Sequence, residues 1–171
     1  MLTKRTMIAC VDVDYRDDHA VAACVLFRDW LDAEPAAEWT HRVAPVAPYQ
    51  PGQFYRRELP CLLAVLAPRL GEVGTVVVDG YVWLRDEHSP GLGAHLYEAL
   101  ERRVAVIGVA KNCFQSAGVA KPVLRGDSKR PLFVTAAGLN LITAAACVRR
   151  MHGGYRIPTL LRRVDQCCRS G

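Results

Sequence analysis

The order of the apolar segments along the chain is the feature that most restricts its fold. Three strand-like segments come first, at residues 7–15, 20–27 and 39–46. Residues 7–15 alternate, so that Met7, Ala9 and Val11 share one face while Asp12 lies on the other. Strands joined by short turns favour an antiparallel meander, whereas the later alternation of helix and strand favours parallel strands covered by helices. We therefore predict an α/β fold whose mixed sheet begins as an antiparallel meander, continues with parallel strands and is flanked by helices.

The remaining elements follow from periodicity and from the placing of proline and glycine. Leucines at helical spacing predict a helix over 54–70, with Pro60 in its first turn and Glu58 at its entry. The other predicted elements are strands at 75–79, 104–109, 119–124 and 131–135, and helices at 91–102, 139–152 and 158–169. Because there is no internal repeat and no linker, we predict a single domain over residues 1–171.

Composition excludes several classes of protein. No apolar run reaches the roughly 18–20 residues that a membrane helix needs, so we expect no contact with a membrane. Only a short apolar stretch separates Lys4 and Arg5 from Asp12, and we therefore expect no signal peptide. The seven cysteines are odd in number and include no Cys-x-x-Cys pair, which favours buried free thiols in a cytoplasmic protein and gives no zinc motif.

The charges of the chain are unevenly distributed. From Lys121 to the end there are ten Lys or Arg residues against two Asp, a balance of +8. Residues 1–120 hold twelve basic and fifteen acidic side chains, a balance of −3. An acidic part joined to a basic part is suited to a polyanion that one part holds and the other cuts. A basic surface that is merely solvated is the alternative.

Several acids and one lysine lie where predicted strands end. Asp12 belongs to the first strand, Asp79 closes the most apolar run of the chain, and Lys111 follows the strand at 104–109. Gly80 lets the backbone turn immediately after Asp79. Carboxylates at buried strand ends are costly unless a cation meets them, and oxygen ligands suit Mg²⁺. These residues predict metal-assisted phosphodiester chemistry, although a single Asp at a strand end is more often a turn or cap residue.

Short motifs throughout the chain resemble, in their order, those of the endonuclease V family. Cys10 to Tyr15 resembles its first-strand Gly-Val-Asp-Val-x-Tyr, and Ile107 to Lys111 matches Ile-Gly-Val-Ala-Lys without change. The other similar segments are Pro48 to Gly52, Phe54 to Pro60, Val78 to Gly80, Gly91 to Leu96, Arg130 to Val134, Tyr155 to Pro158 and Arg162 to Asp165.

The resemblance implies an RNase H-like fold and a Mg²⁺- or Mn²⁺-dependent endonuclease. Such an enzyme nicks DNA or RNA 3′ to a deaminated purine, hypoxanthine or inosine, in nucleic-acid repair. The implied direct metal ligands are Asp12 and Asp79. Glu58 and Asp165 would hold water on the metal or position the nucleophile, and Lys111 would contact the scissile phosphate. We also expect the chain to act as a monomer.

The resemblance further implies that Tyr49 is a wedge that fills the gap left by a flipped-out base. Pro48 and Pro51 stiffen the loop around it, and a rigid aromatic ring loses little entropy on insertion. A core tyrosine is the alternative. Gly80 would lie beside the bound base.

The chain departs from the family pattern after Gly80. Val82 replaces a glycine and Arg85 a histidine, which predicts an altered base pocket because valine adds a side chain and restricts the backbone. Asp14 is an additional acid that could join the metal site or be a solvated strand-end residue. Two alternatives to the lead hypothesis remain: a non-catalytic nucleic-acid-binding protein on the same fold, and a nuclease for another lesion or structure.

Overall fold

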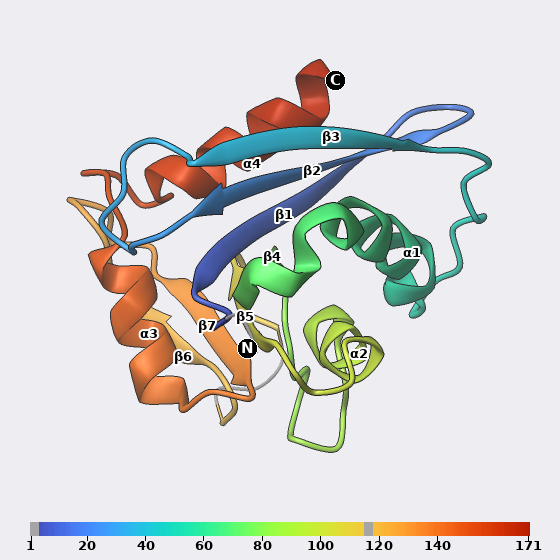
Figure 1. The fold of residues 1–171 in the computed structure, drawn as a ribbon. Helices are drawn as coiled ribbons and strands as arrows, with labels where there is room; N and C mark the ends of the chain where they lie inside the picture. Colours follow the sequence, from blue (N-terminus) through green and yellow to red (C-terminus); the bar gives the residue numbers. More distant parts are fainter. Residues whose placement is uncertain (1–3, 115–117) are drawn as a thin grey trace.

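A seven-stranded mixed sheet runs through the centre of the protein in the computed structural model, which describes residues 4–114 and 118–171 (Figure 1). Within these residues the strand order is β3-β2-β1-β4-β5-β7-β6. The meander comprises β1 (Met7–Tyr15), β2 (Ala20–Phe27) and β3 (Ala37–Val43), with antiparallel pairing throughout. The predicted opening of the sheet is confirmed.

The middle of the sheet is parallel. β4 (Val73–Asp79) pairs in parallel with β1, and β5 (Ala105–Ala110) pairs in parallel with β4. Two later strands, β7 (Leu132–Ala137) and β6 (Lys121–Val123), complete the sheet with antiparallel pairing. The carboxyl ends of β1, β4 and β5 therefore meet at one edge, which is where sites gather in open α/β sheets.

Two helices cover each face of the sheet. One core cluster includes residues of α1 (Phe54–Leu66) and α2 (Leu92–Ala99), and the other includes residues of α3 (Leu141–Arg150) and α4 (Thr159–Ser170) (Figure 1). Residues of β1 alternate between the two clusters: Ala9 and Val11 belong to the first, whereas Cys10 belongs to the second. The predicted two-faced strand is confirmed, and its pleat turns Asp12 toward the α3 and α4 side.

The entry of α1 differs from the prediction. The helix begins at Phe54, so Pro60 is its seventh residue and Glu58 its fifth, well inside the helix. The missing N–H of Pro60 removes one backbone hydrogen bond, and the helix nevertheless continues because its buried face, which includes Leu62, packs on the sheet. A 3₁₀ helix, η1 (Ala67–Glu72), then replaces the last predicted turn.

Most other boundaries move by one to three residues. β3 ends at Val43, two residues before Pro45. α2 ends early because Glu101 and Arg102 adopt positive φ angles of 56° and 58°. α3 starts after Asn140, whose side chain accepts hydrogen bonds from the N–H groups of Ile142 and Thr143. Within the described residues, none of the helices is both long and apolar enough to cross a bilayer.

Gly108 lies close to the ends of the parallel strands, in a position that has no room for a side chain. An added Cβ would lie 2.5 Å from the carbonyl oxygen of Gly80 and 2.7 Å from Oγ1 of Thr135. We expect Gly108→Ala to lower the free energy of unfolding by about 3 kcal/mol, at the upper end of overpacking effects. Denaturant unfolding measures this, with Gly71→Ala as the control, because a Cβ at Gly71 meets nothing within 4 Å. Equal stability of the two variants would contradict the packing.

Candidate active site

The parallel strands bring Asp12, Asp79 and Lys111 to one edge of the sheet. Val11 lies opposite Val78, so Asp12 is level with Asp79. Asp79 lies opposite Val109, two residues before Lys111. These three side chains, with Asp165, line a pocket of about 160 Å³. Its other walls are mostly apolar and include Leu132, Ile157 and Leu161. The structure thus gathers three of the four predicted acids and the predicted lysine around one hollow.

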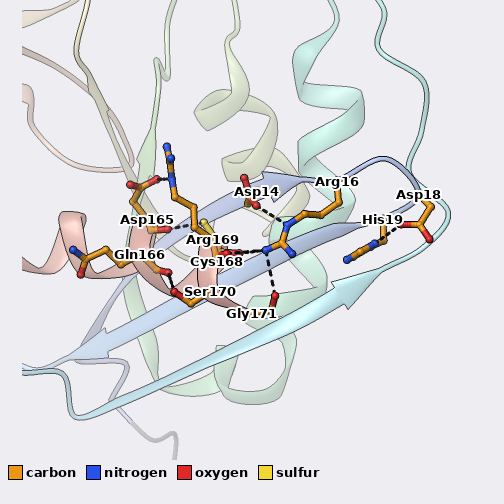
Figure 2. Close-up of polar contacts among 10 residues, drawn as sticks. All are labelled: Asp14, Arg16, Asp18, His19, Asp165, Gln166, Cys168, Arg169, Ser170 and Gly171. Atoms are coloured by element: carbon orange, nitrogen blue, oxygen red, sulfur yellow. Dashed lines mark hydrogen bonds and ion pairs between the residues drawn. The ribbon is translucent and has the colours of Figure 1, made fainter.

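Helix α4 supplies the acid that is most distant in sequence. A carboxylate oxygen of Asp12, one of Asp165 and the sulfur of Cys168 all lie within 4.8 Å of one another. Asp165 also accepts a hydrogen bond from Nε of Arg169 at 3.0 Å (Figure 2). Carboxylates crowded in this way repel unless a cation sits between them or one takes up a proton. The donor set therefore fits a divalent cation.

The pKa values of Asp12 and Glu58 show the same crowding. The pKa of Asp12 is raised from 3.8 to about 6. Burial is the main cause, the charges of Asp79 and Asp165 also raise the pKa, and the N–H of Val13 and the charge of Lys111 oppose the shift. Burial likewise raises the pKa of Glu58 from 4.5 to about 7, with additional contributions from Asp12 and Asp79. Glu58 reaches this acidic group from α1, on the other side of the sheet edge. All four predicted acids therefore act on a shared region of charge.

Asp79 and Lys111 form an ion pair across the strand ends. Nζ of Lys111 lies 3.5 Å from Oδ2 of Asp79, and both side chains are about half exposed. Gly80 follows with a φ of +128°, a conformation that L side chains rarely adopt, and it donates a hydrogen bond to the carbonyl of Val109. The turn that the sequence predicted at Gly80 is present.

Two side chains hold the loop that carries Lys111. Arg156 donates hydrogen bonds to the carbonyl oxygens of Lys111, Arg130 and Pro131. The hydroxyl of Tyr81 donates to the carbonyl of Asn112 at 2.6 Å and accepts from the N–H of Phe114 at 3.0 Å. The backbone is thereby held at the lysine and at the residues that follow it. Arg156 lies within the motif at 155–158, but neither its role nor that of Tyr81 can be inferred from the sequence pattern.

Asp14 has a different partner from the other acids. It forms an ion pair with Nε of Arg16 at 2.7 Å (Figure 2). Arg16 in turn donates hydrogen bonds to carbonyl oxygens at the end of α4, namely those of Cys168, Arg169 and Gly171. This geometry connects Asp14 to the docking of α4 on β1.

The loop of Tyr49 lies on the surface. Tyr49 is 53% exposed and packs edge-on against Phe54, which is 58% exposed, with ring centroids 5.4 Å apart. Pro48 and Pro51 are exposed beside it. The alternative of a core tyrosine is wrong, and the wedge remains a prediction.

The side chain of Val82 points into the core beneath the loop that follows Gly80. Val82 is fully buried in the core, where its Cγ2 lies 2.6 Å from the position that a Cβ on Gly93 would take. Its backbone N–H donates to Oγ1 of Thr135 at 2.8 Å. Trp83 is anchored through a hydrogen bond from Nε1 to the carbonyl of Ala136. The side chain of Val82 therefore packs against α2 at Gly93, and the expected change in the base pocket stays a prediction.

The prediction of buried free thiols holds for most of the cysteines. Five of the seven thiols are buried and all are free, whereas Cys113 is exposed and Cys167 is partly exposed. His95 stacks on Tyr55 with ring centroids 3.6 Å apart, which gives it a packing role. Cys168, one helical turn beyond Asp165, was not predicted as a site residue; its spacing from Asp165 was the available signal.

Sequence comparison connects this geometry to characterised proteins. The family model described as Endonuclease V matches residues 2–129. An Endonuclease V from Streptomyces coelicolor is 33% identical, over 94% of this chain and 76% of its own length.

Structural comparison finds solved structures of the same family. The crystal structure of Endonuclease V from Streptomyces avermitilis is 33% identical, with a TM-score of 0.74 over 96% of this chain and 80% of that one. Ciona intestinalis Endonuclease V, in complex with a 24mer DNA containing an inosine followed by a ribo-adenosine, is 21% identical with a TM-score of 0.80. It covers 98% of this chain and 86% of its own, and shows a shared fold. The predicted RNase H-like fold is confirmed.

The raised pKa values predict an unusual dependence of stability on pH when divalent cations are removed. Because Asp12 and Glu58 hold protons more tightly folded than unfolded, metal-free protein should lose stability as the pH rises from about 4 to about 7. Glu58→Gln should remove a part of this loss of the order of 2 kcal/mol. Thermal unfolding in chelator across this range measures the effect.

The control for this experiment is Glu34→Gln, which changes an exposed acid. Glu34→Gln should leave the pH profile of the wild type unchanged. Adding Mg²⁺ should reduce the loss at neutral pH, since a bound cation favours the ionised acids. A Glu58→Gln profile parallel to that of the wild type would show that Glu58 titrates normally.

Proposed function

The chain belongs to the Endonuclease V family, and from that premise we propose that it nicks a phosphodiester bond 3′ to a deaminated purine with the help of Mg²⁺ or Mn²⁺. Membership makes the chain an endonuclease that acts on DNA with deaminated bases. The proposal adds the base, hypoxanthine, the side of the cut and the metal. The observation that carries it is the gathering of Asp12, Asp79, Asp165 and Lys111 around one pocket.

The residues present fit a divalent cation. Asp12 is largely buried among other acids, and within the described part of the chain it forms no ion pair of its own. We assign Asp12 and Asp79 as its direct ligands, with Asp165 and Glu58 supporting it. When bound, the cation polarises water and offsets negative charge on the phosphate.

The side chains around the pocket have separate tasks in the reaction. Glu58 lies close enough to Asp12 and Asp79 for their charges to act on it, and it is suited to hold or orient the attacking water. Lys111, positioned by the loop contacts of Arg156 and Tyr81, supplies a fixed positive charge where the phosphate gains negative charge. Arg162 lines the same pocket and lies over the ring of Tyr155, 5.3 Å from its centroid. Arg162 is placed to contact the phosphate backbone of the nucleic acid, in keeping with the basic last third of the protein.

Whether the substrate is DNA or RNA depends on contacts to a 2′-hydroxyl. The Ciona intestinalis relative binds a DNA containing an inosine followed by a ribo-adenosine. This supports a strand that carries inosine as the ligand here too, and we propose that the chain accepts inosine in either kind of strand. A non-catalytic nucleic-acid-binding protein on this fold is the less favoured function, because three of the four predicted acids line one pocket and the charges of two of them act on the fourth, Glu58.

The test is cleavage of end-labelled strands that contain deoxyinosine, inosine or unmodified adenine, with Mg²⁺, with Mn²⁺ or with chelator. We expect one nick, 3′ to the inosine, with either metal and none with chelator. Asp79→Asn should lower the rate by at least about a hundredfold, the scale of losing an electrostatic contribution to catalysis. Its affinity for the strand, measured by fluorescence anisotropy in Ca²⁺, should change little.

The matched control is Asp29→Asn. Asp29 follows the end of β2 that pairs with the start of β1, so it lies at the opposite edge of the sheet. This variant should cut at the wild-type rate. No cutting of any strand with either metal would exclude the nuclease proposal, and equal cutting of adenine strands would exclude the specificity for hypoxanthine.

The wedge assignment of Tyr49 gives a separate prediction. Tyr49→Ala should slow the cutting of duplex inosine by about tenfold, because stacking on a base contributes roughly 1–3 kcal/mol. Single-stranded inosine should be cut at nearly the normal rate, since it has no base pair to open. Tyr49→Phe keeps the ring and should behave as the wild type. Equal losses on duplex and single strands would assign Tyr49 to general binding.

A further inference from the structure

Cys168 is a buried thiol beside Asp12 and Asp165. It is 1% exposed and follows Asp165 by one turn of α4, the helix that packs on β1. Its sulfur and one carboxylate oxygen each from Asp12 and Asp165 lie within 4.8 Å of one another. Its Sγ also donates a hydrogen bond to the carbonyl of Asp165 at 3.2 Å, and Figure 2 shows the thiol on the same turn of the helix as that residue.

The position of the sulfur is set by the way α4 ends. Arg16 donates hydrogen bonds to the carbonyl oxygens of Cys168, Arg169 and Gly171, and its Nε is held by Asp14 (Figure 2). Charged donors at a helix carboxyl terminus stabilise it. The last turn of α4 is therefore fixed against β1, and the thiol cannot easily turn away from Asp12.

Two carboxylates and one thiol form a donor set in which the sulfur is not a ligand that Mg²⁺ prefers. Mg²⁺ prefers oxygen ligands in octahedral geometry, whereas sulfur ligands favour thiophilic ions such as Zn²⁺. Usual Zn–S and Zn–O bond lengths place tetrahedral ligand atoms about 3.3–3.6 Å apart. Atoms within 4.8 Å of one another reach that spacing by side-chain shifts of about 1 Å.

We propose that Asp12, Asp165 and Cys168 form a binding site for thiophilic divalent ions, Zn²⁺ or Cd²⁺, which overlaps the catalytic metal site and inhibits the enzyme. The binding part stands on the donor geometry alone, and the inhibition rests on the proposed function. Binding releases the thiol proton to solvent, because the ligand is the thiolate. Sequence spacing relates Cys168 to Asp165 on α4, but it could not relate either of them to Asp12, which comes from β1.

The test is a titration of metal-free protein with Cd²⁺, followed by the ultraviolet charge-transfer absorption of a thiolate bound to cadmium. Wild-type protein should show a band that saturates at one equivalent. Cys168→Ser should weaken Cd²⁺ binding by more than about tenfold, since losing a direct ligand costs more than losing an outer contact. Asp12→Asn should also weaken it.

Cys167→Ser is the matched control. Cys167 is the adjacent thiol, but its Sγ lies 3.5 Å from Oε2 of Glu38, away from the acidic site. This variant should keep the band. Cys168→Ala is the second variant, in case serine disturbs the core, and thermal unfolding of each metal-free variant checks the fold. A band that survives in folded Cys168→Ser or Cys168→Ala, or that disappears in Cys167→Ser, would overturn the proposal.

Cutting of inosine strands in Mg²⁺ then tests the inhibition. Zn²⁺ should inhibit the wild type and Cys167→Ser at concentrations at least about tenfold lower than those that inhibit Cys168→Ala. If no metal supports cutting, the proposed function fails while the cadmium band still decides the site. If Zn²⁺ inhibits wild type and Cys168→Ala alike, Cys168 does not control inhibition.

Discussion

The repulsion among closely placed carboxylates is the constraint on which the site depends. β1 and β4 pair in parallel as far as Val11 and Val78, so Asp12 and Asp79 lie level and cannot separate without breaking the sheet. Helix α4 contributes Asp165 from one face of the sheet, and α1 contributes Glu58 from the other face. The core that packs these elements holds the acids together at a cost, and the pKa values of Asp12 and Glu58 are raised first by burial and then by the charges of the neighbouring acids. A divalent cation bound among the acids, as proposed, would offset that cost and would link folding to metal binding.

Arginines that bond to backbone carbonyls set the positions of the catalytic side chains. Arg16 holds the end of α4, and Arg156 holds the loop of Lys111. Arg125, which is only 4% exposed, donates to the carbonyls of Val148, Arg149 and Met151 at the end of α3, and to that of Gly153. Each places a positive charge at backbone carbonyl oxygens, and Arg16 and Arg125 thereby stabilise the carboxyl ends of α4 and α3. The same bond of Arg16 that orients α4 also fixes Cys168 beside Asp12.

Local patterns predicted well where packing agrees with them and poorly where it overrides them. The alternation in β1 placed Asp12 on the correct face, since a strand has a period of two. Pro60 suggested a later start of α1, but burial of residues such as Leu62 maintains the helix across it. Val82 suggested a changed base pocket, yet its side chain packs against Gly93 in the core. A sequence motif gives the type of residue at each position, but it does not give the direction of the side chain, which depends on the turn before it.

The sequence by itself determined the mixed sheet, the acids at its strand ends and the family to which the chain belongs. These follow from periodicity and from motifs of adjacent residues, which one-dimensional patterns record directly. Only the tertiary structure decided that Tyr81 and Arg156 hold the lysine loop, that Asp14 serves the end of α4 and that Cys168 faces Asp12. Such contacts join residues up to 156 positions apart, as between Asp12 and Cys168, and they depend on the angle at which a helix crosses a sheet. No local pattern contains that angle, because the packing of the whole core sets it.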